Sequence, residues 1–132
     1  MVLEITKQLE QELNKHVINI YVIPCKIGSK IFVPVAPCVY VIYLTYPYNT
    51  LLYIGYSKRC YVRLNYHFYN FNEKSSNLVP KIRELSKALN TPLSELRFKL
   101  IVLMIDSEEY AKIIEKKLIQ DLRPVLNVLY KY

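Results

Sequence analysis

The chain has 132 residues, of which 52% are hydrophobic and 22% are charged, a balance that predicts one buried core and excludes a disordered chain. Lys and Arg number 18 against 11 Asp and Glu, so the formal net charge is +7. This excess indicates either a polyanionic partner or simply a basic surface. No signal peptide and no membrane-spanning run is evident, so we expect a cytoplasmic protein.

Three cysteines, Cys25, Cys38 and Cys60, form no Cys-x-x-Cys pair. Their number and spacing argue against a zinc site or a disulfide framework. We expect them to be small buried hydrophobes.

Residues 1–37 are predicted to be a helix followed by a hairpin. Apolar residues recur at spacings of three and four from Val2 onward, which predicts a helix over 2–16. Residues 17–23 read as a strand, 24–30 as a turn and 31–35 as a returning strand. Pro34 and Pro37 weaken the pairing there, as suits a sheet edge. This segment can extend the sheet, bind substrate or contact a second subunit, and its sequence does not choose among these roles.

A second hairpin is predicted from two β-branched and aromatic runs, 39–45 and 51–54, with a proline-containing turn between them. We expect Gly55 to end the second strand and Ser57 to cap a helix over 58–67. Arg63 and His67 are four residues apart on that helix and share a face. The strand tyrosines and these two residues are therefore candidates to gather at one end of a small sheet.

The remaining elements alternate between helix and strand. An exposed loop over 68–77 precedes a helix over 78–89, whose basic residues either meet a phosphate backbone or are solvated. Pro92 starts a short helical turn, and residues 97–105 form the strongest strand, typical of a central strand covered on both faces. Asp106 or Ser107 caps a last helix that continues to about residue 122, where Pro124 stops it.

Glu115 lies within the apolar arc of that last helix. A carboxylate on a buried face is costly unless a metal ion or an arginine pairs with it. The alternative is a carboxylate near the edge of the arc that reaches solvent or a lysine.

Several of these residues occur as short motifs in a fixed order. They are Cys38-Val39-Tyr40, Tyr53-Ile54-Gly55, Arg63 eight residues after Gly55, His67, Glu115-Lys116-Lys117-Leu118-Ile119 and Pro124-Val125-Leu126-Asn127. Over residues 38–127 the chain resembles the GIY-YIG nucleases, and the combination of motifs is specific although each alone is weak. Cys38 departs from the pattern, because the family usually has glycine there.

The resemblance implies an α+β fold with a small, mainly antiparallel central sheet flanked by helices. We expect a single domain, 1–132, in which residues 1–37 extend a nuclease core at 38–127. The implied activity is metal-dependent hydrolysis of DNA phosphodiester bonds, with a homodimer as one way to cut both strands. The implied catalytic residues are Tyr40, Tyr53, Arg63, His67, Glu115 and Asn127.

Within this set Glu115 is the expected metal ligand. With one carboxylate, a single hard cation such as Mg²⁺, or alternatively Mn²⁺, fits better than a two-metal centre. Arg63 offers a planar fork of donors to the phosphate, and Asn127 is expected to orient the site. Either Tyr40 or His67 can serve as the general base, and the sequence leaves both open.

Two other functions stay open. One is a nucleic-acid-binding module that keeps the fold but does not cut, which Cys38 alone favours. The other is a protein-interaction domain whose positive charge is incidental.

Overall fold

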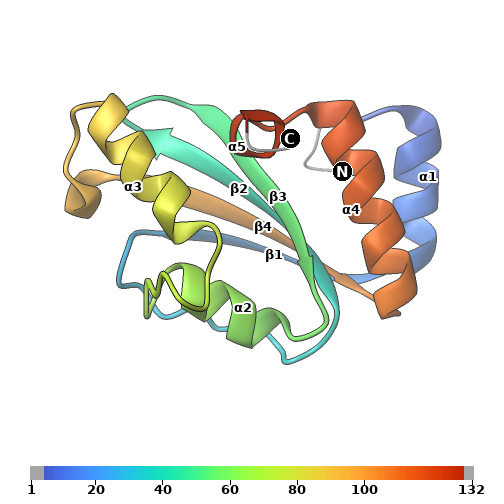
Figure 1. Cartoon of the computed structure of the whole chain (residues 1–132). Helices are drawn as coiled ribbons and strands as arrows, with labels where there is room; N and C mark the ends of the chain where they lie inside the picture. The colour runs from blue at the N-terminus through green and yellow to red at the C-terminus, as the bar shows by residue number, and fades with distance from the viewer. Residues whose placement is uncertain (1–4, 130–132) are drawn as a thin grey trace.

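A computed structural model describes residues 5–129 of the chain, with side chains as far as Asn127. Four antiparallel strands form one sheet in the order β1-β4-β2-β3, and helices cover it (Figure 1). The elements in chain order are α1 (Lys7–His16), β1 (Val17–Cys25), β2 (Cys38–Tyr46), β3 (Thr50–Ser57), α2 (Cys60–His67), α3 (Val79–Ala88), the 3₁₀ turn η1 (Leu93–Glu95), β4 (Arg97–Ile105), α4 (Glu108–Leu122) and α5 (Val125–Leu129).

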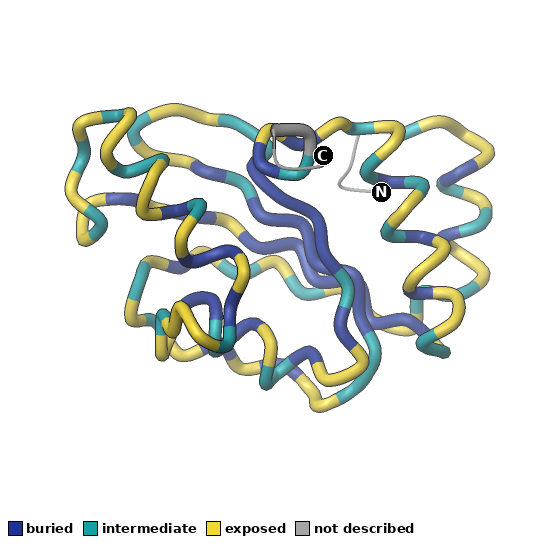
Figure 2. Tube along the Cα trace, viewed as in Figure 1, coloured by how far each residue is buried: buried dark blue, intermediate teal, exposed yellow. Residues whose placement is uncertain are grey.

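Helices lie on both faces of the sheet, so the molecule has three layers (Figure 1). Because side chains alternate along a strand, Tyr40 and Val102 face α2 and α3, whereas Val41 and Ile101 face α1 and α4. Figure 2 shows the central strands buried along most of their length. The predicted fold class, an antiparallel sheet flanked by helices, is confirmed.

The predicted C-terminal strand and helix are confirmed almost to the residue. β4 covers 97–105 and is central, and its burial alternates at first and then becomes continuous. Ser107 is the N-cap of α4, and its hydroxyl accepts the Tyr110 N–H. The three cysteines are free and buried, as expected. Within residues 5–129, no helix is both long and apolar enough to cross a membrane.

The N-terminal extension contributes a helix and an edge strand rather than a hairpin. Among the described residues the helix begins at Lys7, because Thr6 is its N-cap; Val2 lies outside the described residues. The returning strand predicted at 31–35 is wrong. Ile31 is buried, but its backbone N–H and C=O both bond to the side chain of Asn65, and β1 pairs with β4 instead.

Two predicted boundaries in the second hairpin are also wrong. Gly55 does not end its strand: β3 continues to Ser57, and Gly55 pairs with Tyr40 of β2. Ser57 accepts the backbone N–H of Arg59 at 2.9 Å, but α2 begins only at Cys60. The helix that carries Arg63 and His67 therefore starts two residues later than expected.

Candidate active site

The predicted site residues lie around β3, which forms one edge of the sheet. Tyr40 projects from β2 across Gly55 of β3. A Cβ atom at Gly55 would lie 2.4 Å from the Tyr40 hydroxyl oxygen, much closer than any real contact. Glycine is therefore required here because the phenol occupies the space of a side chain.

The Tyr40 hydroxyl lies at the start of a short buried chain of polar side chains. Its oxygen is 2.8 Å from Nε2 of His67, and Nδ1 of His67 is 2.5 Å from Oγ of Ser76. The exposed fractions of these three residues are 2%, 0% and 1%. Burial, with the Arg63 charge adding to it, lowers the pKa of His67 to about 3, so its ring is neutral at physiological pH.

Tyr53 lies beside Tyr40, with 6.3 Å between the ring centroids. Its hydroxyl is 3.5 Å from the side-chain nitrogen of Asn77, and Nζ of Lys81 lies 5.3 Å from the centroid of its ring. Burial raises the pKa of Tyr53, while the Asn77 contact opposes the rise. Asn77, just before α3, and Lys81, within α3, thus contact Tyr53 on the face of the sheet opposite to α4.

The charges of Arg63 and Glu115 shift the pKa of both tyrosines, although the two residues come from helices on opposite faces of the sheet. Burial raises the pKa of Tyr40 well above its usual value; Arg63 opposes this rise, and Glu115 adds to it. The same two charges act in the same directions on Tyr53. Arg63 is exposed and Glu115 is partly buried. The charges of a cation and a carboxylate therefore both act on the same pair of phenols.

Asn127 closes the free edge of β3. Its side-chain oxygen accepts the N–H of Ile54 at 2.7 Å, and its side-chain nitrogen donates to the C=O of Ile54 at 2.9 Å. These are the two bonds that a residue of a neighbouring strand would make. Asn127 thereby fixes α5 to the strand that carries Tyr53 and Gly55.

A family model described as the GIY-YIG catalytic domain matches residues 36–130. The chain belongs to the GIY-YIG family. No curated protein and no solved structure matches it. The resemblance inferred from the motifs is thus confirmed, and the matched region includes every predicted site residue.

Cys38, the departure from the GIY-YIG motif, fits the local backbone of β2. Cys38 lies within β2, is fully buried and does not adopt a positive φ angle. A cysteine at this position therefore imposes no backbone strain, and the tyrosine two residues later keeps its place.

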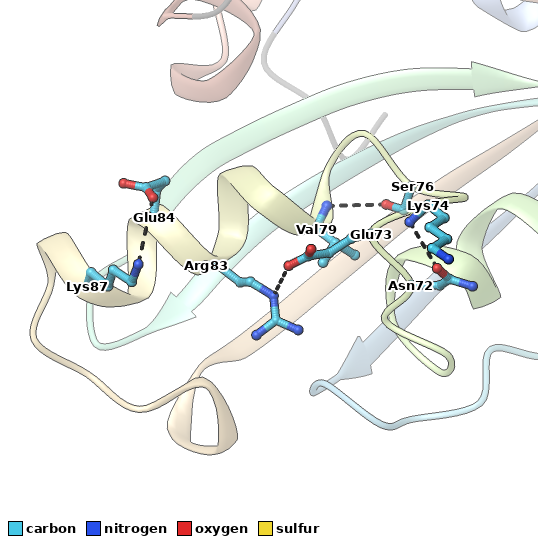
Figure 3. A network of polar contacts seen from close by, with 8 residues as sticks. All are labelled: Asn72, Glu73, Lys74, Ser76, Val79, Arg83, Glu84 and Lys87. Carbon is cyan, nitrogen blue, oxygen red and sulfur yellow. Dashed lines mark hydrogen bonds and ion pairs between the residues drawn. The ribbon is translucent and has the colours of Figure 1, made fainter.

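The three basic residues of α3 have different surroundings in this GIY-YIG domain. Lys81 lies over Tyr53. Arg83 and Lys87 instead form surface ion pairs of 2.6 and 3.9 Å with nearby glutamates (Figure 3). Of the three, only Lys81 lies beside a predicted site residue.

Two residues close to the GIY-YIG site were missed from the sequence. Ser76 and Asn77 fall in the segment predicted to be an exposed loop, yet Ser76 is buried and Asn77 contacts Tyr53. Ser76 stands three residues before Val79, whose N–H it accepts, although the N-cap of α3 is Leu78. A serine at this spacing indicates a bond to the start of a helix, but the contact with His67 depends on tertiary structure.

The donor set at Glu115 fits a water-rich divalent cation. Across residues 5–129, there is no group of three or more His, Cys, Asp or Glu side chains that could hold a metal by itself. A hard cation such as Mg²⁺ commonly keeps several waters and takes one or two carboxylates plus substrate phosphate oxygens. A single partly buried glutamate, which acts electrostatically on the same two phenols as an exposed arginine, matches that requirement.

Proposed function

We propose that this chain is a metal-dependent endonuclease that hydrolyses phosphodiester bonds in DNA. Membership of a nuclease family supports the reaction class. The observation that carries the proposal is the position of the Tyr40 phenol, which rests against Gly55, contacts His67 and lies within the electrostatic reach of both Arg63 and Glu115. These residues supply the kinds of groups that phosphodiester hydrolysis requires.

Arg63 is assigned to the phosphate. Its guanidinium is always charged and presents parallel N–H donors to two phosphoryl oxygens, which lysine cannot copy. Its exposure leaves it accessible to a DNA backbone. Charge that develops on the phosphoryl oxygens in the transition state would be stabilised by this group.

Tyr40 is assigned to the proton transfer, with His67 holding it in place. His67 is fully buried, and its lowered pKa makes it a weak base, whereas the charges of Arg63 and Glu115 both act on the Tyr40 hydroxyl. Burial disfavours the Tyr40 phenolate, so Tyr40 needs nearby positive charge to accept a proton. Arg63 supplies part of that charge.

Glu115 is assigned to the divalent cation, and Mg²⁺ or Mn²⁺ suits its carboxylate. Such a cation supplies further positive charge next to the phosphoryl oxygens. Tyr53, whose ring lies next to that of Tyr40, is assigned to positioning the phosphate, and Asn127 acts through the backbone of β3.

The test is incubation of plasmid and branched DNA with Mg²⁺, comparing the wild type with Glu115→Gln and Arg63→Ala. Each substitution is expected to lower cleavage at least about 100-fold, because it removes a charge that acts in the transition state. Glu108→Gln is the matched control, since Glu108 lies on the same helix and pairs with Lys112 at 3.7 Å on the surface.

The control is expected to cut like the wild type. A wild type that binds DNA but cuts none of these substrates would overturn the proposal in favour of a non-cleaving binding module. Loss of salt-dependent DNA binding as well would favour a protein-interaction domain.

A further inference from the structure

Ser76 occupies a point where three polar groups converge on one hydroxyl. Its Oγ lies 3.2 Å from the backbone nitrogens of both Leu78 and Val79, at the start of α3, and 2.5 Å from Nδ1 of His67. Figure 3 shows the contact between Ser76 and Val79. Ser76 and His67 are both buried.

Counting hydrogens assigns a direction to each of these bonds. A serine hydroxyl accepts at two lone pairs and donates one proton. The N–H groups of Leu78 and Val79 can only donate, so they use both lone pairs. The Ser76 proton is then directed to Nδ1 of His67. The opposite direction would place three donors on one oxygen and leave a buried hydroxyl proton unpaired, which is costly.

The count continues through the histidine ring. A neutral imidazole carries one proton, and because Nδ1 accepts from Ser76, that proton is on Nε2. Nε2 lies 2.8 Å from the Tyr40 oxygen, so His67 is the donor in this bond. The Tyr40 oxygen therefore accepts a hydrogen bond from the protein interior, and its own proton is not used in that bond.

We propose that Ser76 is a positioning residue, which holds His67 in the Nε2–H tautomer and so makes the Tyr40 oxygen the acceptor from His67. The catalytic consequence rests on the proposed function: the Tyr40 proton is directed to the substrate side, where it either bonds to the phosphate or is lost when Tyr40 acts as a base. The opposite tautomer would bind the Tyr40 proton to the ring of His67 and remove it from the reaction.

The neighbouring loop residue supports this arrangement. Asn77 contacts the Tyr53 hydroxyl directly, while Ser76 acts on Tyr40 through His67. Two consecutive residues before α3 thus hold the two phenols. This short segment therefore contacts both the start of α3 and the side chains that orient the two tyrosines.

The tautomer can be measured directly in the full-length, ¹⁵N-labelled protein without any activity assay. The chain has two histidines, so a His16→Asn variant assigns the ring signals of His67. In the wild type at neutral pH, two-bond ¹H–¹⁵N spectra are expected to show the Nε2–H form. In Ser76→Ala this form is expected to lose its dominance, and Ser76→Thr, which keeps a hydroxyl, is expected to retain it.

Finding the Nδ1–H form in the wild type would overturn the inference, as would an unchanged tautomer in Ser76→Ala. Because the readout needs no DNA, it decides this inference even if the protein proves not to be a nuclease. Failure of the proposed function would instead appear as a wild type that has the Nε2–H tautomer and cuts nothing.

Kinetics give a second readout that a purely structural role would not move. With DNA as substrate, Ser76→Ala is expected to lower kcat by about 10-fold to 100-fold with KM changed less than about twofold. Ser107→Ala is the matched control, because Ser107 caps α4 through the Tyr110 N–H and, among the described residues, its hydroxyl has no hydrogen bond with a histidine. A kcat in Ser107→Ala as low as that of Ser76→Ala would contradict the proposal.

Discussion

At the scale of single residues, the candidate site depends on ionisable side chains that are buried in their neutral form. His67 is fully buried between a tyrosine and a serine and stays neutral far below the pH at which a histidine usually protonates. Gly55 makes the arrangement possible, because any side chain there would overlap Tyr40. The motifs identified both residues, but the space that Gly55 provides is visible only in three dimensions.

The burial of His67 predicts a loss of stability in acid. Its pKa is about 3 in the folded chain, against 6.5 for a free histidine, so below pH 6.5 the unfolded chain binds a proton that the folded chain does not. From pH 6.5 down to about pH 3, this residue lowers the free energy of unfolding by up to about 1.4 kcal/mol per pH unit. Urea denaturation of the wild type and His67→Gln at pH 7.5, 6, 5 and 4 measures it.

The two proteins share their other titrating groups, so the comparison isolates His67. The wild type is expected to lose more stability than His67→Gln as the pH falls. Parallel pH dependence in both proteins would show that His67 contributes nothing.

At the scale of the elements, two asparagine side chains replace a β-strand partner. Asn65 bonds to both backbone groups of Ile31, and Asn127 bonds to both backbone groups of Ile54. The first pair explains why 31–35 was mistaken for a strand. The segment is apolar and the backbone of Ile31 is satisfied, but its partner is a side chain 34 residues away rather than a neighbouring strand.

Runs with strong local signals were predictable, because their partners are neighbouring strands or nearby caps. β4 and α4 follow from a continuous apolar run and a serine cap. The site residues expected from the order of the family motifs stay a prediction, although the structure does bring Tyr40, Tyr53 and His67 together. Ser76 was not predicted, because its contact with His67 joins the segment before α3 to the end of α2, and only the tertiary structure brings these together.

Asn127→Ala is expected to lower the free energy of unfolding by about 2–4 kcal/mol. The substitution leaves the N–H and C=O of the fully buried Ile54 without their partners, and each unpaired group costs about 1–3 kcal/mol. Chemical denaturation measures the loss, and amide hydrogen exchange at Ile54 should accelerate.

Asn19→Ala is the control for this prediction. Asn19 lies exposed on β1, where it bonds to the N–H of Ile20 and to Tyr21. Its loss is expected to cost less than about 1 kcal/mol. Similar losses in the two variants would contradict the role assigned to Asn127.

At the scale of the whole molecule, the net charge of +7 and the exposed Arg63 predict electrostatic binding of DNA. Glu115→Gln allows binding to duplex DNA to be measured without cleavage. The association constant is expected to fall as salt rises from 50 to 200 mM, with a log–log slope of roughly −0.9 for each phosphate contacted. Arg63→Ala in the same background is expected to reduce the magnitude of that slope by about 0.9, the contribution of one phosphate contact. A flat salt dependence would contradict a nucleic-acid partner.

The two edges of the sheet are unequal. Asn127 occupies the backbone of Ile54 on the β3 side, whereas no strand among residues 5–129 pairs with the outer side of β1, where Ile18 and Val22 are exposed. If another polypeptide extends this sheet, the edge at β1 offers it an unpaired strand backbone along most of its length. Such growth would take place at the edge opposite to β3 and would leave the exposed Arg63 accessible, so assembly and the proposed cutting need not compete for the same surface.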